Sequence, residues 1–385
     1  MDKVRFGIIG YGNMGSTHAG YFTENKITNG VLTAVADINA KKLEIAKQKL
    51  GGGIKYFNSG EELIRGGAAD AVIIATPHYS HPELSIKALE AGLHVVCEKP
   101  AGVYTKQVKQ MNDVARKSKG LFTIMFNQRT NCIYRKMKEI VQSGGIGELK
   151  RVNWIITNWY RSQSYYDSSD WRATWAGEGG GVLVNQCPHQ LDLLQWIVGE
   201  LPIRVRAFCH FGKWHDIETE DDVTAYLEYR SGATGAFITS TADCPGTNRL
   251  EIIGTKGKLV CEKDNLECYV LKTDEREFNR TYKGGFGEPV VEKQEVVPDG
   301  QNPQHIGILN NFANAVLGTE KLFVDGTEGI KGVQLMNAML LSTWLNKTVE
   351  IPFNDDLFYR QLNKRIKKSK NKKTEDIILN TENTY

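Results

Sequence analysis

The chain has 385 residues, 41% of them hydrophobic and 24% charged, a composition typical of a globular protein with more than one domain. The longest aliphatic run is too short to cross a bilayer and the first residues contain no signal-peptide segment, so we expect a cytoplasmic protein without membrane contact. The formal net charge is +3, but residues 360–373 hold eight Lys and Arg and no acid, and the slightly acidic remainder excludes a nucleic-acid groove.

The first third of the chain alternates short apolar runs with amphipathic helical patterns. The strand-like runs lie at 3–10, 31–37, 70–76, 94–98 and 121–126. The helical patterns between them lie at 13–22, 40–50, 82–91 and 105–117. Repeated strand and helix units of this length predict an α/β Rossmann fold with a doubly wound parallel sheet.

The first apolar run ends in a glycine-rich turn, GYGNMG. Gly10 permits a tight turn, Gly12 lets the backbone approach a pyrophosphate, and Gly15 lets helix and strand pack closely. The helix that starts here also offers N–H donors and a positive dipole to phosphates. We expect the whole turn to bind a dinucleotide, and its members are Gly10, Tyr11, Gly12, Asn13, Met14 and Gly15.

Asp37 ends the second apolar run, 22 residues after Gly15. A carboxylate there accepts hydrogen bonds from ribose hydroxyls and repels a 2′-phosphate, so it favours NAD over NADP. NADP stays open, because Asn39, Lys41 and Lys42 follow closely and could reach a phosphate. We predict an NAD-binding Rossmann domain over residues 1–127, with a glycine turn in a cofactor-free domain as the alternative.

After about residue 148 the pattern changes to strand-like runs separated by turns. The runs lie at 149–160, 203–211, 222–241, 249–254, 258–262 and 266–272, with hairpins expected around 231–233 and within 248–262. Helical patterns at 304–317 and 327–346 predict helices that cover this sheet on at least one side. We expect residues 128–353 to form an α+β domain with a large, mostly antiparallel open sheet. Residues 354–385 should be a solvated, frayed basic tail.

Neither a disulfide framework nor a metal site is expected. Seven cysteines are scattered without a CxxC pair, which indicates reduced thiols. His78 and His81 have an HxxH spacing, but Pro82 follows and no third ligand is near. We therefore predict surface or helix-start histidines there and no bound metal.

Three motifs together resemble those of a known family. ATPHYSHPELSIKALEAGLHVVCEKP at 75–100, GIIGYGNMG before it and EGGGVLVNQCPHQLDLLQW after it resemble the glucose-fructose oxidoreductase, inositol dehydrogenase and MocA family of NAD(P)-dependent oxidoreductases. The resemblance extends over roughly residues 3–353. It implies a Rossmann domain followed by an open-sheet domain that binds a sugar or polyol substrate. It also implies a homodimer or homotetramer, often formed through the outer sheet faces.

Within that family, the loop at 159–181 is most similar to the inositol and levoglucosan dehydrogenase types. Six aromatic residues fall within 159–175, against a chain average of 9%. Such rings suit a polyhydroxylated ring substrate, whose faces pack on aromatic side chains. The candidates for substrate binding in this loop are Tyr160, Gln163, Trp171, Arg172 and Trp175. An interface or sheet-edge cluster is the alternative for some of them.

The resemblance also assigns roles to residues that follow strand ends, where doubly wound folds bind ligands. Glu98, Lys99 and Pro100 match the family's EKP signature, whose lysine lies beside the nicotinamide and the reacting hydroxyl. A solvated Glu–Lys pair is the alternative. The residues expected to line the cofactor are Thr76, Pro77, His78, Glu98, Lys99 and Asn127. Arg129 matches a position near the substrate, although it and Asn127 could equally be structural residues of a domain hinge.

Asn185, His189 and Asp192 are four and then three residues apart, which predicts one helical face. Oxidation of a secondary alcohol requires a base for the hydroxyl proton, and a histidine suits this at neutral pH. His189 is our candidate base, with Lys99 hydrogen-bonded to the substrate oxygen, although the two roles could be exchanged. The alternative for His189 is a helix histidine whose hydrogen bond goes to Asp192.

Asn185 differs from the aspartate that many members of the family carry at this position. An amide supplies no charge, so Asn185 could fix the tautomer of His189, bind a substrate hydroxyl or cap the helix. The missing charge could come from Asp192, which could also simply anchor the helix. We expect Lys99, His189, Asn185 and Asp192 to form the catalytic set. Lys99, Arg129, Asn185 and His189 should contact the substrate together with the aromatic loop.

These residues predict an NAD-dependent dehydrogenase that moves a hydride from a secondary ring hydroxyl to the nicotinamide. The substrate class is a sugar, glycoside, anhydrosugar or cyclitol. One alternative is transient oxidation with recycled bound NAD, which would enable elimination or glycoside cleavage. The other is a non-catalytic, NAD-binding regulatory protein.

Overall fold

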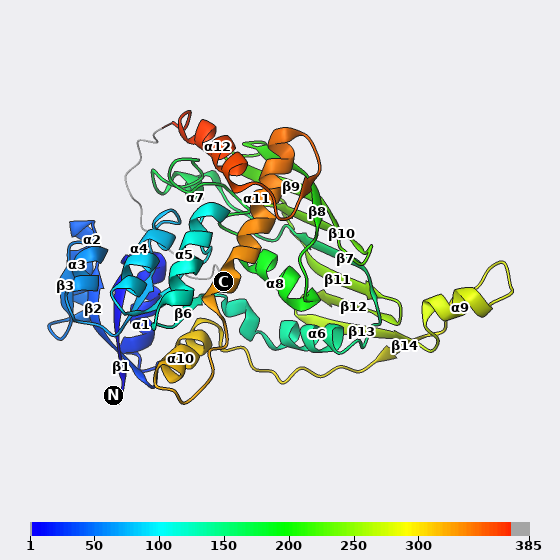
Figure 1. Cartoon of the computed structure of the whole chain (residues 1–385), viewed down its shortest axis with the longest axis horizontal. Coiled ribbons are helices and arrows are strands. Elements are labelled where there is room, and N and C mark those ends of the chain that lie inside the picture. The colour runs from blue at the N-terminus through cyan, green and yellow to red at the C-terminus, as the bar shows by residue number, and fades with distance from the viewer. Residues whose placement is uncertain (1, 371–385) are drawn as a thin grey trace.

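The computed structural model describes residues 2–370, which fold around a six-stranded and a nine-stranded sheet (Figure 1). Helix α11 (Gly329–Leu345) lies between the two sheets. On one side, its Asn337 accepts a hydrogen bond from the backbone N–H of Thr105, and on the other, its Ser342 accepts one from the backbone N–H of Ala207. In this part of the chain, no helix is long and apolar enough to span a membrane.

The six-stranded sheet has the order β3-β2-β1-β4-β5-β6, and every pair in it is parallel. Its strands are β1 (Val4–Ile9), β2 (Gly30–Ala36), β3 (Lys55–Phe57), β4 (Ala71–Ile74), β5 (His94–Cys97) and β6 (Phe122–Ile124). The connecting helices are α1 (Asn13–Thr23), α2 (Ala40–Leu50), α3 (Gly60–Arg65), α4 (Ser80–Glu90) and α5 (Thr105–Lys117). The predicted doubly wound Rossmann arrangement is confirmed.

The central strands are apolar because helices cover both faces of this parallel sheet. All four residues of β4 are fully buried. The strand order reverses beside β1, so the ends of β1 and β4 frame the crevice in which doubly wound folds bind ligands. The sequence prediction missed β3 and α3, because a three-residue strand is too short for a periodic pattern.

The nine-stranded sheet has the order β14-β13-β12-β11-β7-β10-β9-β8-β15 and is antiparallel except between β7 and β10. Its strands are β7 (Leu149–Ile156), β8 (Arg204–Phe211), β9 (Glu220–Glu228), β10 (Thr234–Ser240), β11 (Asn248–Gly254), β12 (Gly257–Glu262), β13 (Asn265–Leu271), β14 (Val291–Gln294) and β15 (Val349–Glu350). Both predicted hairpins form, since β9 pairs with β10 and β11 with β12. The prediction of a mostly antiparallel open sheet is confirmed.

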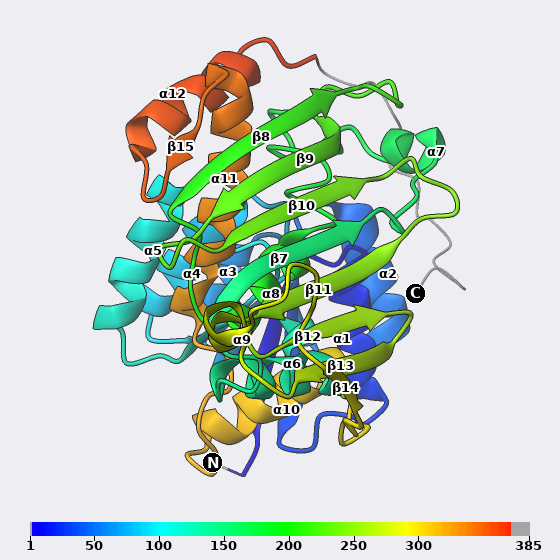
Figure 2. The same cartoon turned by 90° about the vertical axis from the view of Figure 1, so that its right-hand side faces the viewer.

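Helices cover one face of this second sheet, and they are α6 (Cys132–Gln142), α8 (Pro188–Val198) and α11 (Figure 1). Figure 2 looks onto the opposite face, which α6, α8 and α11 do not cover and in front of which α9 projects. Helix α9 (Glu275–Thr281) projects from the body beside β13 and β14 (Figure 1), and none of its residues is buried.

Helix α10 (Gln304–Val316) does not lie where the sequence predicts it. It packs against the six-stranded sheet, where the rings of Phe312 and Phe6 are 6.3 Å apart. Asn310 accepts a hydrogen bond from the backbone N–H of Thr28 (2.9 Å). The expectation that this helix covers the second sheet is wrong, because its Phe312 packs on the buried Phe6 of β1 and its asparagines bind the residues before β2.

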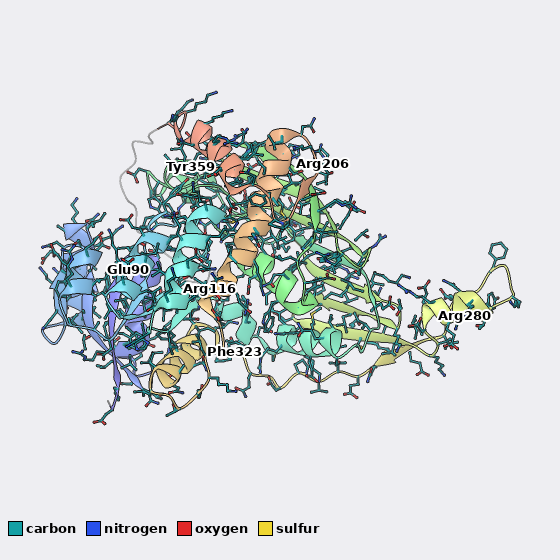
Figure 3. The ribbon with its side chains drawn as sticks, in the orientation of Figure 1. Glu90, Arg116, Arg206, Arg280, Phe323 and Tyr359 are labelled. Carbon is teal, nitrogen blue, oxygen red and sulfur yellow. The ribbon has the colours of Figure 1, made fainter. Side chains whose placement is uncertain are left out.

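The prediction of a frayed tail from residue 354 is also wrong for its first part. Residues Asp355–Ile366 form helix α12, in which Phe358 and Leu362 are buried. Tyr359 of the same helix (Figure 3) packs against Tyr104, with ring centroids 5.0 Å apart. Arg360 and Lys364 lie on the exposed side of this amphipathic helix, whereas the guanidinium carbon of Arg365 lies 4.0 Å from the ring centroid of Trp344, an arrangement that composition alone does not reveal. Residues 371–385, where the tail prediction continues, lie outside the described part.

Leu362→Ala is expected to lower the free energy of unfolding by about 2–5 kcal/mol, because it removes a fully buried side chain between α12 and the core. Denaturant titration followed by fluorescence measures this. Arg360→Ala, on the exposed side of the same helix, should stay within about 0.5 kcal/mol of the parent. Equal stabilities of the two variants would mean that α12 contributes nothing to the fold.

Candidate active site

The glycine turn between β1 and α1 has the geometry of a dinucleotide cradle. Gly10 has φ 93°, and a Cβ there would lie 2.7 Å from the carbonyl oxygen of Ala75. A Cβ on Gly15 would lie 1.9 Å from the carbonyl oxygen of Gly10, whereas one on Gly12 would meet nothing within 4 Å. The backbone at Gly12 therefore faces open space at a helix N-terminus, as a pyrophosphate requires.

Gly15→Ala should raise the Kd for NADH about ten- to hundredfold, because the added methyl group must push α1 away from β1 at a cost of about 1–3 kcal/mol. NADH fluorescence titration measures the change. Gly20→Ala in the same helix is the matched control, since its Cβ would come no closer than 3.8 Å to another atom. If the two variants bound NADH equally well, the turn would not be the cofactor site.

Asp37 follows β2 and faces the glycine turn. Its carboxylate accepts hydrogen bonds from the backbone N–H groups of Tyr11 and Asn39, both at 2.7 Å. A carboxylate offers about four lone-pair positions, so ribose hydroxyls can donate to it as well. The side-chain oxygen of Asn39 caps α2 by accepting from the backbone N–H groups of Lys41 and Lys42. These contacts fit NAD.

Glu98 follows β5 and is buried, so the alternative of a solvated pair is wrong for it. Its Oε1 lies 2.7 Å from Nε2 of His18 on α1. Burial alone would raise the pKa of the Glu98 carboxyl, but the hydrogen bond to His18 and nearby cationic groups lower it to about 2. The ionised carboxylate therefore fixes the end of β5 against α1.

Lys99 reaches from the end of β5 to the loop before α8. Its Nζ donates a hydrogen bond to the backbone oxygen of Asn185 (2.9 Å). Burial lowers the pKa of this ammonium, and the charges of Arg161 and Arg172 act in the same direction, while two nearby carboxylates oppose them. Because an ammonium has three donors, further N–H groups remain for a substrate oxygen.

His189 is the second residue of α8, after Pro188. Its Nδ1 is buried and has no hydrogen-bond partner within the described chain. Burial lowers the pKa of the His189 imidazole well below its ordinary value of 6.5, and the charge of Lys99 lowers it further. The imidazole is therefore neutral at pH 7 and can accept a proton.

Asn185 precedes α8, so the prediction that it shares a helical face with His189 is wrong. Cys187 is the N-cap residue, and Asn185 lies in the turn before it. Its Nδ2 donates to Oε1 of Glu178 and to the hydroxyl of Tyr165 (3.2 Å). The side chain of Asn185 therefore does not cap α8. The carboxylate that it binds, that of Glu178, lies outside this helix.

Glu178 is a buried carboxylate beside Lys99 that the sequence prediction missed. It is 1% exposed, and its Oε2 accepts a hydrogen bond from the backbone N–H of Ala173 (2.6 Å). Burial raises the pKa of its carboxyl, although the charge of Arg172 and its hydrogen bonds oppose the shift. Glu178 is thus the acidic group that the structure places in hydrogen-bond contact with the side chain of Asn185.

Arg129 and Asp192 bind each other. Both are buried, and Nε and Nη2 of Arg129 donate to the two carboxylate oxygens of Asp192 at 2.7 and 2.6 Å. Nη1 of Arg129 donates to Glu328 in the 3₁₀ turn η2 (Gly326–Glu328) at 2.5 Å. The structure therefore contradicts the predictions that Arg129 binds substrate and that Asp192 supplies charge to His189. The pair ties α8 to the turn η1 (Asn127–Thr130).

The aromatic loop is divided between the protein core and the site. Trp175 is buried, with its ring centroid 5.6 Å from that of Trp344, so the prediction that it binds substrate is wrong. Tyr160 is 52% exposed. Gln163 begins α7 (Gln163–Asp167), and its amide bonds to the backbone of Asp216 in the neighbouring loop. Substrate contact by Tyr160 and Gln163 stays a prediction.

Trp171 and Arg172 lie beside the residues already described. The Arg172 guanidinium is 4.3 Å from the ring centroid of Tyr165, and its Nη1 donates to the Tyr165 hydroxyl (2.7 Å). The ring of Trp171 meets that of His78 edge-on at 6.1 Å. The other predicted cofactor residues occupy the same end of the first sheet: Asn13 and Met14 in the first turn of α1, Thr76, Pro77 and His78 after β4, and Asn127 after β6.

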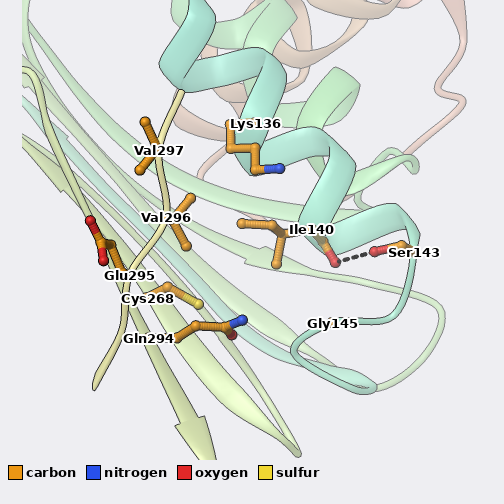
Figure 4. Close-up of a pocket in the computed structure, with 9 residues that line it drawn as sticks. All are labelled: Lys136, Ile140, Ser143, Gly145, Cys268, Gln294, Glu295, Val296 and Val297. Carbon is orange, nitrogen blue, oxygen red and sulfur yellow. Dashed lines mark hydrogen bonds between the residues drawn. The ribbon is translucent and has the colours of Figure 1, made fainter. Parts of the chain in front are cut away.

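The two histidines of the HxxH motif are buried, so the prediction of surface residues is wrong for them, although His81 does lie at the start of α4. The ring of His81 lies between the carbonyl oxygens of Thr76 (2.7 Å) and Pro100 (2.8 Å), so it joins two loops at the strand ends. Among residues 2–370, no cluster of His, Cys, Asp and Glu is suitable for a metal ion. A cavity of about 270 Å³ between α6 and residues 294–297 (Figure 4) contains none of the site residues named above.

The fold and the site are those of an NAD-dependent oxidoreductase. Residues 4–126 match the oxidoreductase family with an NAD-binding Rossmann fold, and residues 134–260 match the GFO/IDH/MocA C-terminal domain. The chain therefore belongs to the GFO/IDH/MocA family of oxidoreductases, as its motifs predict.

Relatives in this family are named as sugar and cyclitol dehydrogenases. The chain is 30% identical over 283 residues to myo-inositol 2-dehydrogenase of Thermotoga maritima, covering 71% of this chain and 79% of that protein. It is 24% identical over 323 residues to levoglucosan dehydrogenase of Pseudarthrobacter phenanthrenivorans, covering 74% and 81%. It is also similar to the structure of the WlbA dehydrogenase from Bordetella pertussis in complex with NADH and UDP-GlcNAcA. The TM-score is 0.77, with 26% identity over 91% of this chain and 100% of that one.

Proposed function

We propose that this protein oxidises a secondary ring hydroxyl of a sugar or cyclitol and transfers the hydride to NAD. The observation that carries the proposal is that Lys99, which follows β5 at the end of the sheet where the glycine turn lies, donates a hydrogen bond to the backbone oxygen of Asn185, four residues before His189. The relatives' names support a ring polyol as substrate. Because those relatives are dehydrogenases, net oxidation is favoured over elimination with recycled NAD and over a regulatory role.

In the proposed mechanism, His189 and Lys99 act on the same hydroxyl group, His189 as the base and Lys99 as a hydrogen-bond donor. His189 accepts the hydroxyl proton as general base, because burial and the charge of Lys99 lower its pKa and keep the imidazole in the neutral, proton-accepting form. Lys99 donates a hydrogen bond to the same oxygen and stabilises the negative charge that develops there. The glycine turn and Asp37 would hold NAD, whose nicotinamide would accept the hydride.

Asn185 and Glu178 position the lysine in this proposal. The backbone oxygen of Asn185 accepts from Lys99, while its side chain is fixed by Glu178 and Tyr165. The charge of Glu178 also acts on the Lys99 ammonium. The loop before α8 therefore sets both the direction and the electrostatic environment of Nζ.

The decisive experiment is turnover with a panel of cyclitols, pyranosides and anhydrosugars. NADH absorbance should rise with at least one of them when purified protein and NAD are present. Tight NADH binding without oxidation of any member of the panel would contradict the proposal and favour a regulatory protein. Product formed without net NADH would favour elimination with recycled NAD.

The pH dependence of kcat/KM tests His189. A base must be unprotonated to act, and burial places the pKa of His189 well below 6.5. Oxidation should therefore keep its full kcat/KM at pH 6.5 and decline only at lower pH. Steady-state rates at constant ionic strength measure this profile. A decline that begins above pH 6.5 would assign the proton transfer to another group.

We also propose a cytoplasmic, homo-oligomeric protein. All seven cysteines are free, which suits a reducing compartment. The open face of the nine-stranded sheet in Figure 2 supports a dimer or tetramer built on that face. Light scattering coupled to size-exclusion chromatography gives the oligomer size, and a monomeric mass would contradict this proposal.

A further inference from the structure

The charges around the candidate site are unbalanced. Arg161 and Arg172 lie close enough to Lys99 for their charges to act on its ammonium. Glu178 is the carboxylate beside Lys99 and Arg172, and its two oxygens already accept hydrogen bonds from Asn185 and from the backbone N–H of Ala173. The other nearby carboxylate, that of Glu98, is paired with a histidine. Within the described chain, positive charge therefore exceeds negative charge at this site.

Aromatic rings fix both arginines in place. The guanidinium carbons of Arg161 and Arg172 lie 5.0 and 4.3 Å from the ring centroid of Tyr165. Arg161 also lies 5.6 Å from the ring centroid of Trp159, and Arg172 lies 4.8 Å from that of Trp171. Such rings attract a cation without neutralising its charge.

The hydrogen bonds of the two guanidinium groups go to neutral acceptors. Arg161 donates to the backbone oxygen of Tyr160 (2.9 Å), and Arg172 donates to the hydroxyl of Tyr165 (2.7 Å). The Nε atom of each is buried and has no partner in residues 2–370. The buried guanidinium of Arg129, in contrast, is bound by two carboxylates. Buried donors and charges without partners are costly, and a bound anion would remove that cost.

The two arginines are connected to the reacting position. The Tyr165 hydroxyl, which accepts from Arg172, also accepts from the Asn185 side chain at 3.2 Å. The backbone oxygen of Asn185 in turn accepts from Lys99 at 2.9 Å. Arg172 is thus linked to Lys99 through the side chain of Tyr165 and through the side chain and backbone of Asn185.

On the basis of the proposed function, we propose that the substrate is an acidic sugar. Its ring carboxylate is bound by Arg161 and Arg172, while Lys99 contacts the hydroxyl that is oxidised. A guanidinium group presents two parallel N–H donors that match the two oxygens of a carboxylate. The arginines then determine specificity, and the lysine and histidine carry out the chemistry.

Matched sugar pairs test this inference. We expect kcat/KM to be about ten- to hundredfold higher for glucuronate or galacturonate than for glucose or galactose, because a charged hydrogen-bonded contact is worth roughly that factor. The ratio of acid to neutral sugar should fall toward one in Arg161→Gln and in Arg172→Gln. It should stay unchanged in Arg116→Gln, an exposed arginine of α5 (Figure 3). Added NaCl should raise KM for the acids only.

Calorimetric titration of the NADH-saturated protein with the same sugars separates this inference from the proposed function. Acid binding that weakens in Arg172→Gln, without oxidation of any sugar, would support the inference and refute the dehydrogenase. Equal turnover of acids and neutral sugars, with the same ratio in all variants, would refute the inference and leave the dehydrogenase intact. Preference for glucose 6-phosphate over glucuronate would overturn the carboxylate assignment.

Discussion

Replacing Lys99 by alanine is expected to lower kcat/KM for sugar oxidation by about 10²- to 10⁴-fold. The structure gives Lys99 Nζ one hydrogen bond, to the backbone oxygen of Asn185, so its other N–H donors remain for a substrate oxygen. Without it, the oxygen that loses its proton to His189 has no cation beside it. The midpoint of thermal unfolding should change little, because Lys99 forms no ion pair within the described chain.

The control for this experiment is Lys106→Ala. Lys106 is exposed and pairs with Asp356, so its loss should leave kcat/KM unchanged. His189→Ala should lower activity to a similar extent as Lys99→Ala, and the double variant should be little worse than either single one, since the two residues act on the same oxygen. Activity of Lys99→Ala within tenfold of the parent would remove the lysine from the mechanism.

The local features of the cofactor domain could be predicted because each depends on neighbouring residues. The GYGNMG turn needs only its own glycines and the strand before it, and Asp37 follows from the length of the strand–helix–strand unit. Helix α10 could not be placed in the same way. Its position depends on contacts with residues about 300 positions earlier in the chain, such as Phe312 with Phe6 and Asn310 with Thr28.

The candidate site shows the same limit. Lys99 and His189 were identified by their motifs, but Glu178 was not, although it directly precedes the glycines of EGGG. No periodicity reveals that its carboxylate faces Asn185, because the contact depends on the path of the loop around Ala173. The sequence signal that could have pointed to Glu178 is an acid directly before three glycines.

The structure also changes the interpretation of the asparagine at position 185. An aspartate at this position would place a second carboxylate within hydrogen-bond distance of Glu178. Two adjacent carboxylates disfavour their joint ionisation. The amide is therefore the compatible partner for Glu178, since it donates a hydrogen bond where an aspartate would repel. The role of Asn185 in this chain therefore depends on its contact with Glu178.

Arg129→Leu is expected to lower the free energy of unfolding by about 3–5 kcal/mol, the second large effect that the structure implies. The substitution leaves the carboxylate of Asp192 buried without the two N–H donors that bind it at 2.7 and 2.6 Å. Denaturant titration measures the loss. The double variant Arg129→Leu/Asp192→Leu should recover most of it, because the uncompensated charge is removed.

The pH dependence of this loss identifies its origin. Burial raises the pKa of the Asp192 carboxyl even with Arg129 present, and removal of the cation must raise it further. An acid whose pKa is higher in the folded than in the unfolded state binds its proton more tightly when the protein is folded. Its protonation therefore stabilises the fold fully below the unfolded pKa, and this stabilisation is lost as pH rises. Arg129→Leu should therefore regain stability relative to the double variant as pH is lowered from 7. If kcat/KM fell while stability did not, Arg129 would be a substrate residue after all and the ion pair would be incidental.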